Sequence, residues 1–131
     1  MIFVDSNVPM YLVGAARPNK DRLKRLLDDL IRTRTRFVTD VETYQEILHR
    51  YSAIGRLDAI DAAFACLDTI ADEKLTFGMQ EIHAARDILL TVDGISARDA
   101  LHVAVMRSAG VSRILSLDKG FDACPGIERL S

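Results

Sequence analysis

The chain has no tryptophan, three prolines and two cysteines among its 131 residues, and only 6% of it is aromatic. Cys66 and Cys124 show no C-x-x-C spacing, which argues against a zinc site and makes a reduced setting the default expectation. No run reaches the roughly 18 apolar residues of a membrane span. The N-terminal MIFVDSN also lacks the basic segment of a secretory signal. We therefore expect a cytoplasmic protein that does not associate with a membrane.

Glycine-rich phosphate-binding motifs are missing as well. Neither G-x-G-x-x-G nor G-x-x-x-x-G-K-[ST] occurs, and this excludes the usual dehydrogenases and P-loop nucleotide hydrolases. The sequence contains no internal repeat and no low-complexity segment. Its hydrophobic content of 49% and charged content of 27% are typical of a globular protein. We expect one domain over residues 1–131.

The net charge of −2 is unevenly distributed along the chain. Residues 17–36 contain eight basic and three acidic side chains, a net charge of +5, which leaves −7 for the remainder. Apolar residues at helical spacing run through the same segment: Leu23, Leu26, Leu27, Leu30 and Ile31. This pattern favours an amphipathic helix with a solvated basic face. Contact with a nucleic-acid backbone, tested most directly at Arg32, Arg34 and Arg36, is the alternative.

Short apolar runs alternate with helical patterns along the chain. The sequence predicts strands at residues 2–5, 37–39, 75–77 and 113–116, and leaves a fifth open at 127–130. Helices are expected as a short one ending near Gly14, a long one after Pro18, and others at 40–54, 56–71, 80–91 and 97–109. Strands that alternate with helices predict an α/β fold. We expect a three-layer sandwich with a mostly parallel central sheet of four to five strands.

Four acidic residues fall where a predicted strand ends or a predicted helix begins. They are Asp5, Glu46, Asp99 and Asp118. Ligand crevices of open α/β sheets lie outside the carboxyl ends of the strands, so these side chains are expected at one edge. Carboxylate oxygens are the ligands that hard divalent cations prefer. The sequence therefore predicts a metal site for chemistry on phosphate esters.

Each acid also has an ordinary structural explanation. Asp5 could cap the helix that follows it, and Asp118 could be a turn residue. Asp99 stands three residues after Ser96, in an arrangement that resembles a helix cap. Any one of these acids is weak support for a site, whereas four at one edge favour it.

We expect Glu46, and not Glu42, to belong to the metal site because of a capping motif. Thr39-x-x-Glu42 fits the capping box, which would occupy Glu42 and leave Glu46 free; simple solvent exposure is the alternative for Glu46. Three histidines lie on predicted helices without paired metal-ligand spacing, and we expect structural or surface roles for them: His49, His83 and His102.

Four short motifs occur in the order and spacing of a known family. They are IFVDSN with Asp5, TYQEIL with Glu46, ARDALHVAV with Asp99, and ILSLDKGF with Asp118. These motifs resemble those of the PIN domains, in particular the small VapC-type toxins of toxin–antitoxin pairs, over nearly the whole chain. One position departs from the pattern, because the family often has an acid where this chain has Gly120.

The resemblance implies a PIN-like fold and a Mg²⁺- or Mn²⁺-dependent endoribonuclease with one or two ions. A cognate antitoxin would hold the enzyme inactive, and a homodimer is a further family expectation. Asp5 and Asp99 would be the principal ligands, with Asp118 and Glu46 ligating directly or through water. Residues expected to orient these carboxylates are Ser6, Asn7 and Ser116, while the part of Asp122 is left open.

Two other classes of protein remain open from the sequence. A receiver-like or haloacid-dehalogenase-like domain also has an acid after its first strand, but the run Asp5-Ser6-Asn7 fits neither an acidic pair nor Asp-x-Asp. A non-catalytic binding module would use the acids as caps and turns. Such a module should show no stabilisation by Mn²⁺, since only a ligand of the native state stabilises it.

Overall fold

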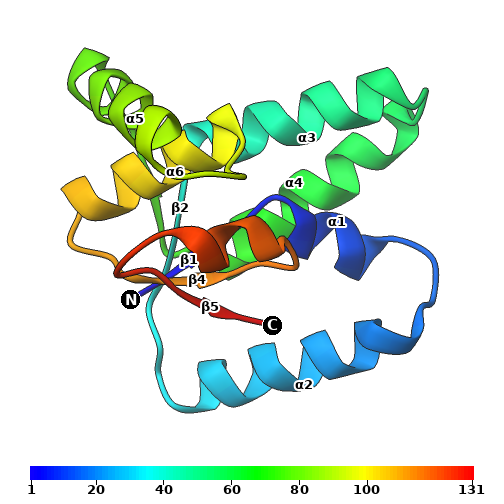
Figure 1. Ribbon diagram of the computed structural model, residues 1–131. Coiled ribbons are helices and arrows are strands. Elements are labelled where there is room, and N and C mark those ends of the chain that lie inside the picture. Colours follow the sequence, from blue (N-terminus) through cyan, green and yellow to red (C-terminus); the bar gives the residue numbers. More distant parts are fainter.

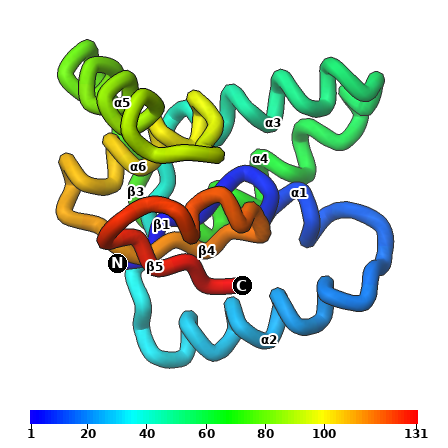
Figure 2. Tube along the Cα trace, viewed as in Figure 1, coloured from blue at the N-terminus to red at the C-terminus, as the bar shows by residue number.

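Five short parallel strands form the centre of the protein in the computed structural model, which describes all residues 1–131 (Figure 1). The strands are β1 (Ile2–Val4), β2 (Phe37–Asp40), β3 (Glu73–Leu75), β4 (Arg113–Leu115) and β5 (Glu128–Leu130). Their order in the sheet is β3-β2-β1-β4-β5, and every pair is parallel. Figure 2 shows β1 in the middle of the sheet, although it begins the chain. The predicted parallel sheet is confirmed, and the fifth strand exists.

Six α-helices and two 3₁₀ helices surround the sheet. They are α1 (Asn7–Val13), α2 (Pro18–Arg32), α3 (Val41–Ala53), η1 (Leu57–Ala59), α4 (Ile60–Ile70), α5 (Met79–Thr91), α6 (Ala97–Ser108) and η2 (Lys119–Ala123). No helix has the length and apolar character needed to cross a membrane.

Two hydrophobic cores lie on opposite faces of the sheet. Side chains alternate along a strand, so Phe3 packs with α5 and α6, whereas Ile2 and Val4 pack with α1, α2, α3 and α4. All three of these β1 side chains are fully buried. The result is the expected three-layer arrangement of helices, sheet and helices.

Two predicted elements differ from the structure. The third strand lies two residues earlier than expected, at Glu73–Leu75, because it is an edge strand whose first two side chains are exposed and carry no apolar pattern. Phe77, predicted to be in this strand, packs instead against the core under α5 and α6. The helix predicted at 56–71 is divided into η1 and α4, and its first apolar residue, Leu57, is 66% exposed.

The capping box predicted at Thr39 and Glu42 is wrong. Thr39 belongs to β2, is fully buried, and donates its hydroxyl to the carbonyl of Val4 at 2.9 Å. Asp40 caps α3 instead, because its Oδ1 accepts the backbone N–H of Thr43 at 2.9 Å. The helix therefore starts directly at the end of β2, and its second turn lies beside the end of β1, where Ser6 contacts Glu46.

Candidate active site

Asp5 follows β1 directly and is 3% exposed. Its Oδ1 accepts the backbone N–H of Ser6 at 2.8 Å, and its Oδ2 accepts the hydroxyl of Ser116 at 2.6 Å and the amide of Asn7 at 3.2 Å. Burial raises the pKa of Asp5, while the nearby His102 opposes this shift. Asp5 is thus a buried carboxyl group whose orientation is set by three donors.

Glu46 lies on the second turn of α3, and its side chain is 13% exposed. One carboxylate oxygen, Oε2, accepts the hydroxyl of Ser6 at 3.0 Å. The other, Oε1, is hydrogen-bonded to Nε2 of His102. Glu46 is therefore held on the side of α3 that faces Asp5, rather than extended into solvent.

Asp99 and Asp118 share a hydrogen bond between their carboxyl groups. Asp99 is 6% exposed in the first turn of α6, where the Ser96 hydroxyl accepts its backbone N–H at 3.1 Å. Burial raises the pKa of Asp99 to about 8, and the hydrogen bond to Asp118 and the charge of Asp5 add to the shift. The same hydrogen bond lowers the pKa of Asp118, which is exposed. Near neutral pH the two groups share one proton.

The expected orienting residues Ser6, Asn7 and Ser116 all contact the acids. Asn7 donates to Asp5, donates to the Ser116 hydroxyl at 3.2 Å, and accepts the backbone N–H of Leu117 at 3.2 Å. The Ser116 hydroxyl also accepts the backbone N–H of Asp118 at 3.0 Å. These bonds join the end of β1 to the end of β4, so the two strands position their acids together.

Asp122 is placed differently from the four acids. It is exposed on η2 and forms an ion pair with Arg129, whose Nε lies 2.9 Å from Oδ1 of Asp122. Arg129 in turn donates to the backbone carbonyl of Ser116 at 3.1 Å. Asp122 is therefore linked to the four acids only indirectly, through its ion pair with Arg129 and the hydrogen bond from Arg129 to the backbone of Ser116.

His102 and Asp40 were missed from the sequence, yet both belong to this site. His102 is fully buried, with Nδ1 2.8 Å from Oδ2 of Asp40, Nε2 bonded to Glu46, and Nε2 3.9 Å from Oδ1 of Asp5. Burial by itself lowers the pKa of His102, but the hydrogen bonds to Asp40 and Glu46 outweigh it and hold the pKa well above its ordinary value. One signal was available, because His102 follows Asp99 by three residues and so lies on the same side of α6.

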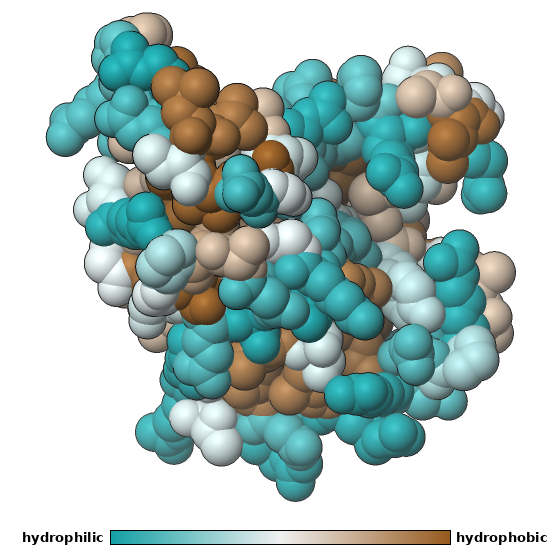
Figure 3. Space-filling model, viewed as in Figure 1, coloured by the Kyte–Doolittle hydropathy of each residue, from teal (hydrophilic) through white to brown (hydrophobic).

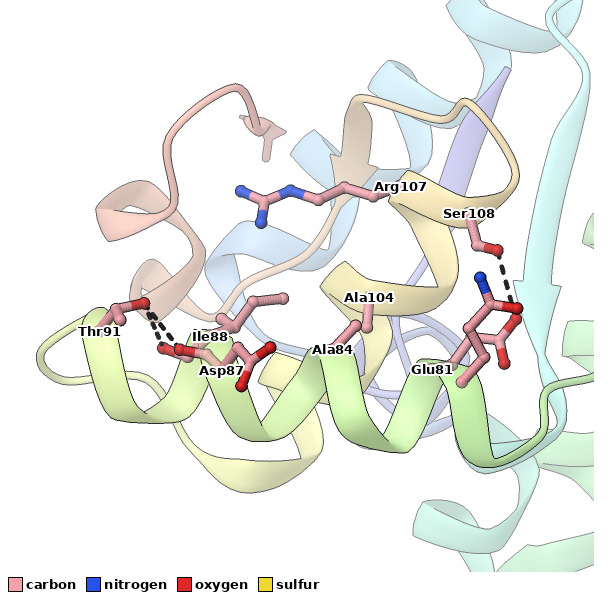
Figure 4. Close-up of a pocket in the computed structure, with 9 residues that line it drawn as sticks. Glu81, Ala84, Asp87, Ile88, Thr91, Ala104, Arg107 and Ser108 are labelled. Carbon is pink, nitrogen blue, oxygen red and sulfur yellow. Dashed lines mark hydrogen bonds between the residues drawn. The ribbon is translucent and has the colours of Figure 1, made fainter.

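Five acids and one histidine thus form a single acidic basin at the carboxyl edge of the sheet: Asp5, Asp40, Glu46, Asp99, Asp118 and His102. Ligand atoms of Asp5, Glu46 and His102 lie within 4.8 Å of one another. A donor set made mostly of carboxylate oxygens suits a hard divalent cation. The groove between α5 and α6 in Figure 4 is a separate feature, since none of these six residues lines it.

The fold and the basin define the class of protein. The profile of the PIN domain family matches residues 2–126, so the chain belongs to the PIN domain family. Within it, the chain is 50% identical to ribonuclease VapC13 of Mycobacterium tuberculosis over 131 residues, 100% of both chains. The chain is therefore a member of the VapC ribonucleases. This membership excludes the receiver-like and haloacid-dehalogenase-like alternatives.

Solved structures agree with this fold. The crystal structure of Mycobacterium tuberculosis VapC20, described as a toxin that cleaves the sarcin-ricin loop, superimposes with a TM-score of 0.78 at 24% identity over 98% of both chains. VapBC2 of Rickettsia felis, solved with a fragment of its promoter DNA, matches with a TM-score of 0.74 at 12% identity, over 99% of this chain and 98% of that one.

Proposed function

We propose that this VapC-type ribonuclease cleaves RNA at the acidic basin, using a divalent cation held by Asp5, Asp99 and Asp118. Glu46 would ligate directly or through water. The observation that carries the proposal is the crowding of carboxyl groups at one edge of the sheet, where Asp5 and Asp99 are buried and the ligand atoms of Asp5 and Glu46 lie within 4.8 Å of each other. Carboxyl groups this crowded repel one another when ionised, and a divalent cation relieves that repulsion better than one proton does.

The chain's own residues prepare the basin for the cation and for RNA. When bound, Mg²⁺ or Mn²⁺ supplies Lewis acidity toward the scissile phosphate and makes a water more acidic. Asp5 is held in one orientation by Ser116 and Asn7, so little freedom is lost when it ligates. The proton between Asp99 and Asp118 must leave when the cation enters. Asp118 is exposed, so the phosphate would approach the basin from its side.

The basic segment at residues 17–36 supports RNA binding less than the sequence suggested. Arg34 and Arg36 directly precede β2, and so lie at the amino edge of the sheet, opposite the basin. Arg36 is also paired with Glu73 at 3.2 Å. Two other cations, Arg98 and Lys119, directly adjoin Asp99 and Asp118 in the chain and are better placed to contact the phosphate backbone.

Two protein partners are part of the proposal. A cognate antitoxin is supported by membership of the VapC family and by the shared fold with VapBC2. A homodimer is supported by apolar side chains exposed on α5, of which Leu90 is 76% and Met79 64% exposed; Figure 3 shows apolar surface over this helix. The molar mass in solution, measured by light scattering, tests the homodimer. The cytoplasmic location stays a prediction from the sequence.

Cleavage of total cellular RNA tests the site. We expect discrete products from the purified wild type with Mg²⁺ or Mn²⁺ and none with excess EDTA. Asp5→Asn and Asp99→Asn should lose at least about 100-fold in rate, as expected when a ligand of a catalytic metal is removed. Asp93→Asn, which changes an exposed acid outside the basin, is the matched control and should cleave normally. Full activity of Asp5→Asn would place the chemistry elsewhere.

A further inference from the structure

His102 is fully buried, yet both nitrogens of its ring face carboxylates. Nδ1 lies 2.8 Å from Oδ2 of Asp40. The other oxygen of Asp40, Oδ1, accepts the backbone N–H of Thr43 at 2.9 Å and its hydroxyl at 3.1 Å. Asp40 is therefore fixed to the start of α3 through one carboxyl oxygen and contacts the ring of His102 through the other.

Nε2 of the same ring holds Glu46. It is bonded to Oε1 of Glu46, while Oε2 of that carboxylate accepts the hydroxyl of Ser6. Glu46 thus contacts donors from α6 and from the start of α1, although it projects from α3. A glutamate on a helix surface has three side-chain torsions and would otherwise sample many positions, most of them in solvent.

Phe3 fixes the ring of His102 from the sheet side. The two ring centroids are 5.2 Å apart with an interplanar angle of 50°, and both side chains are fully buried. The ring has therefore no room to turn away from its two carboxylates, because buried side chains are packed at crystal-like density.

We propose that His102 is a positioning residue of the active site: Asp40 orients its ring, and its Nε2 holds the Glu46 carboxylate beside Asp5. The inference rests on the proposed function, because a fixed Glu46 matters only if the basin binds a cation and RNA. Both ring nitrogens are already engaged by carboxylates, so His102 acts through Glu46 and not as a ligand. Asp40 has no direct part in the chemistry and serves to orient the ring.

Two variants separate the two hydrogen bonds of the ring. An asparagine amide reaches about the position of Nδ1, so His102→Asn keeps the bond to Asp40 and loses the bond to Glu46. A glutamine amide reaches about the position of Nε2, so His102→Gln keeps a donor for Glu46 and loses the bond to Asp40. Both remove a buried ring that packs on Phe3, so a purely structural role would impair the two variants alike.

The readouts are the cleavage rate with saturating RNA and the Mn²⁺ dissociation constant, each measured on protein shown to be folded by circular dichroism. We expect His102→Asn to lose about 10–100-fold in both, as is usual for partners that orient a metal site, and His102→Gln to recover most of that loss. In a Glu46→Gln background, His102→Asn should add little, since the group that it positions is already changed. The proposal would be overturned if His102→Asn caused the same loss in the Glu46→Gln background as in the wild type.

Equal losses in the asparagine and glutamine variants would also overturn the proposal and leave His102 as a packing residue. Failure of the proposed function would give a different result in the RNA cleavage assay. The wild type would then be inactive, or Asp5→Asn would still cleave RNA. NMR of the wild type needs no variant and remains informative if both variants unfold. We expect nuclear Overhauser contacts between the ring of His102 and the side chain of Glu46 in the metal-free and the Mg²⁺-bound protein, and their absence would overturn the proposal.

Discussion

Replacing Asp99 by asparagine should stabilise the metal-free protein. Burial and the hydrogen bond to Asp118 raise the pKa of Asp99 from an ordinary 3.8 to about 8, so the folded chain keeps a proton that the unfolded chain releases at neutral pH. Asparagine resembles the protonated acid, because its amide donates a hydrogen bond to Asp118 without having to take up a proton. The variant therefore avoids the free-energy cost of keeping Asp99 protonated in the folded state.

The size of this cost follows from the shift in pKa. One pKa unit corresponds to about 1.4 kcal/mol, which gives an upper bound of about 4 kcal/mol at pH 7. Asp118 is exposed and water solvates the pair from that side, so we expect about half of this bound, roughly 2 kcal/mol. In a domain of this length that gain corresponds to a melting temperature higher by about 8 °C.

The pH dependence has a definite sign. Below about pH 4 Asp99 is protonated in the folded and the unfolded chain, so wild type and variant should be almost equally stable. As the pH rises from about 4 to about 8, only the unfolded chain releases the proton, and the free energy of unfolding of the wild type falls. The advantage of Asp99→Asn should therefore grow across this range and stay constant above it.

Thermal denaturation with excess EDTA, followed by circular dichroism at about pH 5 and about pH 7.5, measures the effect. Saturating Mn²⁺ should reverse the order, because it stabilises the wild type by RT ln(1 + [L]/Kd) and the variant much less. Asp93→Asn is the control and should change nothing, since Asp93 is exposed. A less stable Asp99→Asn at neutral pH, or an advantage independent of pH, would refute the shared proton.

Two further substitutions test the surroundings of the basin. An alanine Cβ at Gly120 would lie 3.1 Å from Oδ1 of Asp118, so Gly120→Ala should displace this carboxylate and raise the Mn²⁺ dissociation constant by about 3–10-fold. Gly78→Ala, whose Cβ would meet nothing within 4 Å, should leave that constant unchanged in the same titration. Thr39→Val removes the buried donor to the carbonyl of Val4 and should cost about 1–3 kcal/mol of unfolding free energy in urea denaturation. Thr39→Ser keeps the hydroxyl, and an equal loss in both variants would assign the effect to packing.

Much of the fold could be predicted because its signals are local. The alternation of apolar runs with helical patterns located most elements, and the parallel sheet followed from that alternation. The sequence misplaced edge strand β3 by two residues, because its exposed residues have no apolar pattern. The capping box failed for a different reason, since the hydroxyl of Thr39 is used by a neighbouring strand, which no local spacing records.

The sequence by itself determined the fold class and the four acids at the carboxyl edge, because both depend on where each strand ends. Only the tertiary structure decided how those acids are held. His102 and Asp40 lie 62 residues apart in the chain, and His102 contacts Glu46 because β2, α3 and α6 pack together. The proton shared by Asp99 and Asp118 likewise depends on burial and on a contact between two separate elements. Spacing along a chain records neither burial nor contacts between distant segments, so these features of the site became visible only in three dimensions.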